Sequence, residues 1–256
     1  MNEWQVAEVL KADSFGCVER LEGPGGSLIR RVVGGGRIPG SNFVARRLLN
    51  RERRTLEALD GLEGVPQLAH EPGACAAIRA GDAPPRAADI LVRGFVRGAP
   101  LHQAEELAED FFDHLDALVH ALHERGVCHN DLHKEQNIVV GEDAFPHLID
   151  FQLSSVHRGR GWLFASRVRD DLRHVQKHRR RYTRDGRGPH SASAEFGKGH
   201  GMRRGGVALV WRKSGKPLYN FVTRKLLRTS DGEERRPSSG PWPSWVAARG
   251  QRGERA

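Results

Sequence analysis

The chain has 256 residues and a formal net charge of +9 at pH 7, with a sequence pI near 10.1. This balance favours anionic partners: nucleotides, nucleic acid or an acidic membrane surface. The three cysteines lie far apart and form no C-x-x-C pair, which argues against a disulfide framework or a zinc site. The first residues lack the regions of a signal peptide, and no apolar run is long enough to span a bilayer. We therefore expect a cytoplasmic protein with one large core or two small ones.

The first 33 residues predict three β-strands, at 6–10, 17–21 and 27–33, with a glycine-rich turn at 23–26. The segment Asp13-Ser14-Phe15-Gly16 separates the first two strands, and Gly16 is its only glycine. The following run Gly34-Gly35-Gly36 is not a P-loop, because no Gly-Lys-Ser/Thr follows it. We interpret that run as a linker.

Residues 42–60 predict a helix that starts at a cap formed by Ser41 or Asn42. Helical spacing gives it an apolar stripe made of Val44, Leu48, Leu56 and Leu59. Glu52 falls in the middle of this stripe, whereas Glu57 lies on the far side. A buried carboxylate needs a basic partner, because an unpaired buried charge is very costly.

The middle of the chain predicts one strand and one long helix. Residues 67–86 are rich in Ala, Pro and Gly, and their pattern is uninformative. Residues 89–98, which include Phe95, predict a strand leading to a turn. Residues 103–125 predict a helix that ends before Gly126. Its expected core face consists of Leu107, Phe111, Leu115, Leu118 and Leu122.

The stretch from Gly126 to Phe151 organises the rest of the chain. Two short apolar runs, 138–140 and 148–149, flank a Gly/Asp turn and predict a β-hairpin. Antiparallel pairing would bring Asn137, at the start of one strand, beside Asp150, at the end of the other. The loop that carries Asp131 lies at the same edge. Converging oxygen-bearing side chains suit Mg²⁺, which prefers oxygen ligands.

The sequence His129-Asn130-Asp131-Leu132, followed by Asn137 and then by Asp150-Phe151, resembles the catalytic loop and metal segment of the protein-kinase-like superfamily. More narrowly, 127–140 and 148–153 resemble small bacterial kinases grouped with RIO-type and lipopolysaccharide-core kinases. The resemblance implies a two-lobed α+β fold. An antiparallel-sheet N-lobe would span residues 1–97 and a mainly helical C-lobe residues 98–228.

The resemblance also implies roles for individual residues. Asp131 would orient and deprotonate the acceptor hydroxyl, while Asn137 and Asp150 would hold Mg²⁺ on the phosphates of ATP. Gly16 would belong to the phosphate cover, and adenine would stack against the segment that contains Phe95.

In such kinases a strand lysine pairs with a glutamate of the first helix, and here an arginine would replace it. Arg30 and Arg31 point to opposite faces of the third strand. We favour Arg30 as the partner of Glu52, and Arg31 remains open.

Two features depart from the common kinase pattern. Five residues rather than four separate Asp131 from Asn137, which predicts a bulged loop. In that loop Lys134 could reach the γ-phosphate instead of His133, which we interpret as structural. The third residue of the metal segment is Gln152 rather than Gly, which suggests that the segment has little freedom to flip.

Beyond Phe151 the chain becomes strongly basic. Residues 168–182 predict a helix on which Asp170 or Asp171 could brace the catalytic loop by accepting its N–H groups. We expect a disordered insertion at about 184–206, an amphipathic basic segment at 217–228 and a tail at 229–256.

These features favour an ATP- and Mg²⁺-dependent phosphotransferase, similar to an atypical serine/threonine protein kinase. Its acceptor hydroxyl could belong to a protein or to a sugar of an envelope glycolipid. Arg158, Arg160, Arg167 and Arg169 would suit a glycolipid at the inner membrane face, and the same charges would suit an acidic protein or RNA. A second hypothesis is a non-catalytic kinase-fold scaffold on RNA or membrane. A third is a metal-dependent phosphohydrolase that uses His129, Asp131 and His133.

Overall fold

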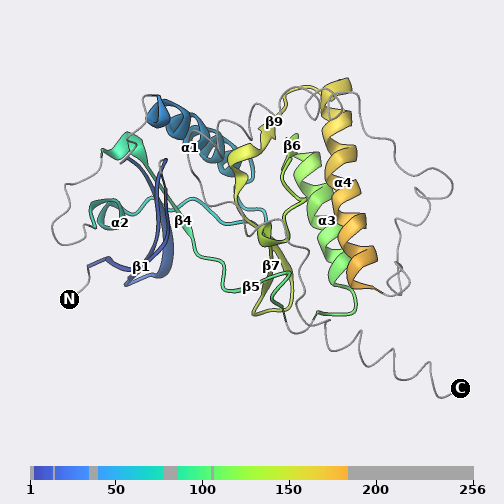
Figure 1. The fold of residues 1–256 in the computed structure, drawn as a ribbon, viewed down its shortest axis with the longest axis horizontal. Coiled ribbons are helices and arrows are strands. Elements are labelled where there is room, and N and C mark those ends of the chain that lie inside the picture. Colours follow the sequence, from blue (N-terminus) through green and yellow to red (C-terminus); the bar gives the residue numbers. More distant parts are fainter. Residues whose placement is uncertain (1–2, 14, 35–39, 78–85, 105–106, 184–256) are drawn as a thin grey trace, which may run out of the picture.

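The structure, a computed structural model, describes residues 3–13, 15–34, 40–77, 86–104 and 107–183 (Figure 1). Its N-terminal region is an antiparallel sheet in the order β1-β2-β3-β4, and helices dominate the region that follows. This arrangement confirms the expected α+β class. The strands of the first sheet are β1 (Gln5–Asp13), β2 (Gly16–Gly23), β3 (Gly26–Val33) and β4 (Ile90–Gly94).

The two faces of this sheet pack against different helices. Leu91 of β4 belongs to the large core that includes Leu49 and Leu56 of α1 (Ser41–Ala58). Its neighbours Ile90 and Val92 pack instead in a smaller core with the short α2 (Pro72–Ala76). Because successive strand residues point to opposite faces, α1 and α2 cover opposite sides of the sheet.

Helix α1 matches the predicted helix in extent but not in rotation. Its buried face is centred on Ala45, Leu49, Glu52 and Leu56, whereas Val44 is 44% exposed. The prediction therefore placed the first half of the apolar stripe one residue too early, at Val44 and Leu48 instead of Ala45 and Leu49. The predicted cap was also wrong: the helix follows Gly40, which has a left-handed φ of 83°, and no side chain caps it.

The second region combines short strands with two long helices. α3 (Phe111–Glu124) and α4 (Trp162–Tyr182) run side by side (Figure 1). β5 (Gly98–Pro100), β7 (Ile138–Gly141) and β8 (Pro146–Leu148) form an antiparallel sheet, and β6 (Val127–Cys128) pairs with β9 (Ser155–Val156). Single turns of 3₁₀ helix are η1 (Ala87–Asp89), η2 (Glu135–Asn137) and η3 (Phe151–Leu153).

Two helix starts differ from the prediction. α3 begins at Phe111 rather than at residue 103, because the preceding chain is used otherwise: Leu101 N–H donates to the Ile138 carbonyl and extends the small sheet. Leu107 is buried all the same, in a non-helical segment. α4 begins at Trp162, six residues earlier than expected, directly after Gly161. As expected, Gly126 follows α3 with a φ of 74°.

The two regions are tied together at the C-terminal end of α1. Thr55 Oγ1 and Ser154 Oγ lie 2.5 Å apart, which fastens the helix to the segment after η3. Within the described part of the chain, no helix is long and apolar enough to cross a bilayer. The predicted insertion at 184–206, the segment at 217–228 and the tail at 229–256 lie outside the described residues.

Candidate active site

The hairpin of β7 and β8 brings Asn137 beside Asp150, as predicted. Ile138 pairs with Leu148, and Ile149 N–H donates to the Asn137 carbonyl at 3.0 Å. Asp150 then takes a left-handed φ of 65°, a conformation that Asp tolerates better than most residues. Strand β8 ends at Leu148, and the backbone turns at Asp150 into η3.

Asp131 is buried in this loop, and neighbouring groups occupy its carboxylate. Oδ1 lies 3.0 Å from His133 Nδ1, and Oδ2 lies 3.0 Å from Asn137 Nδ2 and 3.5 Å from Lys134 Nζ. Burial alone would raise the pKa of Asp131, but the hydrogen bond with His133 and the nearby charge of Lys134 lower it below its usual range. The side chain is therefore ionised at neutral pH.

The extra residue of the loop is absorbed by η2. Lys134 N–H donates to the Asp131 carbonyl, and Asn137 N–H donates to the Lys134 carbonyl. This turn folds His133 and Lys134 back so that both side chains reach Asp131.

The oxygen donors of this edge fit a hard cation. The amide nitrogen of Asn137 donates to Asp131, which leaves its amide oxygen as the donor to a metal ion. Asp150 Oδ1 is buried and accepts no hydrogen bond from any described residue. A carboxylate and an amide oxygen are ligands that Mg²⁺ takes in proteins.

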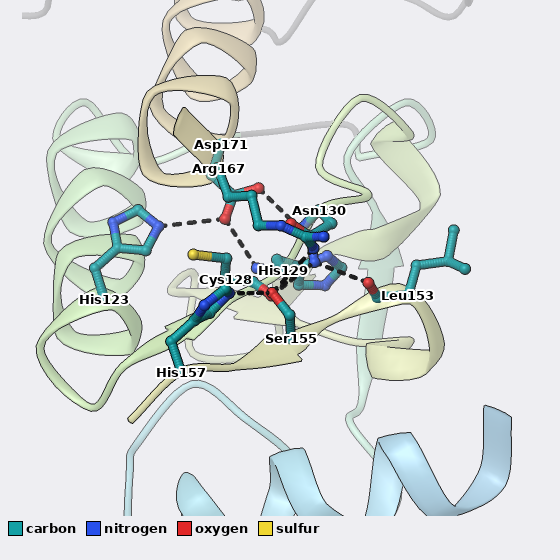
Figure 2. A network of polar contacts seen from close by, with 9 residues as sticks. All are labelled: His123, Cys128, His129, Asn130, Leu153, Ser155, His157, Arg167 and Asp171. Carbon is teal, nitrogen blue, oxygen red and sulfur yellow. Dashed lines mark hydrogen bonds and ion pairs between the residues drawn. The ribbon is translucent and has the colours of Figure 1, made fainter. Parts of the chain in front are cut away.

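Helix α4 braces the catalytic loop through Asp171 (Figure 2). One carboxylate oxygen accepts the His129 N–H at 2.8 Å and the other accepts the Asn130 N–H at 2.9 Å. His123 Nε2 of α3 lies 3.2 Å from the same side chain. Of the two candidates for this bracing role, Asp170 and Asp171, the structure selects Asp171.

The loop in turn holds the metal segment. His129 is fully buried, its Nε2 lies 3.0 Å from the Ile149 carbonyl, and its ring packs 4.8 Å from that of Phe151. Asn130 Nδ2 donates to the Leu153 carbonyl at 2.8 Å (Figure 2). Asp131 and Asp150 are thus positioned by a single hydrogen-bonded unit.

Further along the loop, α4 also anchors Glu135. Arg181 Nη1 and the Tyr182 hydroxyl contact its carboxylate at 2.8 and 2.6 Å. Burial acts to raise the pKa of Glu135, but hydrogen bonds from His178 and Tyr182 and the charge of Arg181 outweigh it and lower the pKa to about 2.

The prediction that Arg30 is the partner of Glu52 was wrong. Arg30 points to the α2 face, where it pairs with buried Glu19 at 2.8 Å and donates to α2 carbonyls. Arg31, the alternative, approaches Glu52 with its Nε at 3.4 Å. Arg93 of β4 approaches the other oxygen of Glu52 at 3.3 Å. Arg31 Nη2 also lies 4.0 Å from Asp150 Oδ1, so the arginine links the sheet to the metal segment.

The sequence analysis did not predict Arg93 as a partner of Glu52. A charged residue directly after the apolar run Ile90-Leu91-Val92 could have indicated a buried charge. Burial lowers the pKa of the Arg93 guanidinium, and the carboxylate of Glu52 opposes that shift. The cluster of Arg31, Glu52 and Arg93 therefore has one carboxylate shared between two cations.

The segment that holds most of these groups matches a known family. The model of the phosphotransferase enzyme family, APH, matches residues 28–157, just over half of the chain. The chain belongs to this family. The family is part of the protein-kinase-like superfamily, so the kinase-like fold is confirmed, and phosphoryl transfer is its chemistry. No curated protein matches the chain.

In this phosphotransferase two residues expected to contact the nucleotide, Gly16 and Phe95, lie in or next to the N-terminal sheet. Gly16 opens β2 with a φ of 136°, and a Cβ there would collide with the Val32 carbonyl oxygen, so the strand pairing itself requires glycine. Phe95 directly follows β4, and the Arg20 guanidinium lies over its ring at 5.7 Å. Their contact with nucleotide stays a prediction, as do the roles of Asp131, Lys134, Asn137 and Asp150.

Proposed function

We propose that the chain is an ATP- and Mg²⁺-dependent phosphotransferase that moves the γ-phosphoryl group to a hydroxyl. One observation carries the proposal: Asn137 hydrogen-bonds Asp131, and the pairing of Ile149 with Asn137 brings the following Asp150 to the same end of the β7–β8 hairpin. Asn137 and Asp150 would hold Mg²⁺, which when bound neutralises charge on the phosphates. Asp131 draws the acceptor hydroxyl toward the γ-phosphorus, so that catalysis rests on positioning and charge.

The cluster around Glu52 supports a nucleotide site at this edge. In the superfamily a strand cation contacts the phosphates and is held by a helix glutamate. Arg31 has the matching neighbours, Glu52 on α1 and Asp150 beyond the hairpin. We propose that Arg31 takes the place of the usual lysine and that Lys134 reaches the γ-phosphate from the opposite side.

Two classes of acceptor follow from the resemblance to RIO-type and lipopolysaccharide-core kinases: a protein serine or threonine, and a sugar of an envelope glycolipid. Arg158 and Arg169 are exposed near the start of α4, and basic side chains of this kind suit an acceptor carried on an anionic surface. Transfer to peptides and transfer to glycolipid in anionic vesicles would distinguish the two classes.

The decisive test measures the melting temperature with and without Mg²⁺-ATP. A ligand at 100 times its Kd stabilises the native state by about 2.7 kcal/mol, which is several degrees for a domain of this size. We expect this shift in the wild type and in Glu142→Ala, an exposed acid of the same hairpin, and its loss in Asp150→Ala. A shift of equal size in Asp150→Ala would refute the assignment.

A further inference from the structure

Two arginines from different helices lie around the start of β9. Arg51 of α1 is one turn before Thr55, whose hydroxyl is 2.5 Å from that of Ser154. Arg167, in the second turn of α4, donates from Nη1 to the hydroxyl of the next residue, Ser155, at 3.1 Å (Figure 2). The two helices therefore bring these arginines to the same short segment of the chain.

A third arginine completes a cluster of positive charge. Arg47 lies one turn before Arg51 on α1, so the two side chains are neighbours on the helix surface. Burial and the charges of Arg47 and Arg167 lower the pKa of the Arg51 guanidinium. Of the residues that the structure describes, none forms an ion pair or a side-chain hydrogen bond with Arg47 or Arg51. The three cations therefore repel one another.

The two acids on α4 already have other partners. Asp170 lies 3.3 Å from Arg173. The Asp171 carboxylate accepts the two N–H groups of the catalytic loop. One arginine of the cluster is exposed and the other two are half-buried, so an anion from solvent can reach them.

We propose that Arg47, Arg51 and Arg167 form a binding site for a phosphate group between α1 and the start of α4. A phosphate monoester carries about −1.5 to −2 charges at pH 7 and offers three acceptor oxygens. Guanidinium groups match such oxygens with pairs of N–H donors. A carboxylate offers one charge and two oxygens, which suits one arginine rather than three. This site is separate from Asn137 and Asp150, and the inference does not depend on the proposed function.

The site adjoins the unit that holds the catalytic loop. The Ser155 hydroxyl, which accepts from Arg167, also lies 3.1 Å from Asn130 Nδ2 (Figure 2). Arg51 belongs to the helix that carries Glu52. A phosphate held by Arg51 and Arg167 would thus connect α1 with α4, and binding should stabilise the contact between the two regions.

The test titrates the full chain with inorganic phosphate and measures the melting temperature. Mg²⁺ and nucleotide are left out, and chloride keeps the ionic strength constant. Phosphate also stabilises proteins by exclusion from their surface, so the specific effect is the difference between the wild type and Arg51→Gln/Arg167→Gln. We expect a saturable shift in the wild type only. Each single substitution should weaken binding roughly 10- to 100-fold.

Two further variants separate the site from a general effect of charge. Arg169→Gln removes an exposed arginine from the same helix α4 and should keep the saturable shift. Arg51→Lys keeps the charge and should retain part of the affinity that Arg51→Gln loses. A saturable shift that is absent from the wild type, or equal in the double variant, would overturn the inference. All variants should keep the Mg²⁺-ATP melting shift, so this result is independent of the proposed function.

A phosphoserine peptide of otherwise neutral sequence identifies the source of the phosphate. Tighter binding of this peptide than of inorganic phosphate would assign the site to a phosphorylated chain. Equal affinity would assign it to free phosphate or a small phosphate ester. If the unphosphorylated peptide binds as tightly as the phosphorylated one, the three arginines do not recognise phosphate, and the inference is wrong.

Discussion

The substitution Glu52→Gln tests whether one buried carboxylate holds the sheet and α1 together. Glu52 has no exposed surface, and two guanidinium nitrogens lie 3.3 and 3.4 Å from its oxygens. At an effective dielectric constant near 20, each contact corresponds to about 5 kcal/mol of gross attraction, before desolvation is subtracted. Removal of one partner of a buried pair typically costs roughly 3–5 kcal/mol, because the surviving charges lose their compensation.

For a domain of this size such a loss lowers the melting temperature by roughly 6–20 °C, which thermal unfolding followed by circular dichroism resolves. Glu57→Gln is the control, since Glu57 is exposed on the opposite side of α1, and it should change stability by less than about 0.5 kcal/mol. Adding Arg93→Met to Glu52→Gln should recover part of the loss, because one uncompensated cation is gone. Equal melting temperatures for Glu52→Gln and Glu57→Gln would refute the reasoning.

Three further predictions concern the catalytic loop. Asp131→Asn should keep the Mg²⁺-ATP melting shift but lose about 10²- to 10⁴-fold in phosphoryl transfer; transfer at the wild-type rate would contradict its role. Asp171→Asn keeps one acceptor oxygen for the two loop N–H groups, so destabilisation by about 1–3 kcal/mol in urea unfolding is expected, and no change would show that Asp171 does not brace the loop. The carboxylate of Glu135 stabilises the fold above pH 4.5, and this contribution disappears as the pH falls toward 2. Glu135→Gln should therefore be less stable by up to about 3 kcal/mol at pH 7, with the gap closing at acid pH; a gap independent of pH would contradict this.

The juxtaposition of Asn137 with Asp150 could be predicted from the sequence because it depends on short-range rules. Two apolar runs around a Gly/Asp turn define a hairpin, and antiparallel pairing determines which ends meet. The helix glutamate was also predictable, because a charge within an apolar stripe demands burial with a partner. Helix α4 could be linked to the loop because a carboxylate can accept backbone N–H groups, but the sequence did not choose between Asp170 and Asp171.

Short-range sequence rules could not decide which arginine is the partner of Glu52. Strand alternation places Arg30 and Arg31 on opposite faces, but only the packing of both helices shows which face each covers. The deciding element, α2, lies in an Ala/Pro/Gly-rich stretch without a helical pattern, and its carbonyls together with Glu19 take up Arg30. The contact of His133 with Asp131 was equally hidden, because it depends on how the loop folds back before η2.

The contact between Thr55 and Ser154 has a consequence for motion. It fastens α1 to the segment that follows Asp150, while Glu52 holds the same helix to β3 and β4 through Arg31 and Arg93. Helix α1 is therefore attached on both sides, and any widening between the sheet and the Asp150 segment has to break one of these two attachments. Amide hydrogen exchange should accordingly be slower in the middle of α1 than in the strands at the outer edge of the sheet.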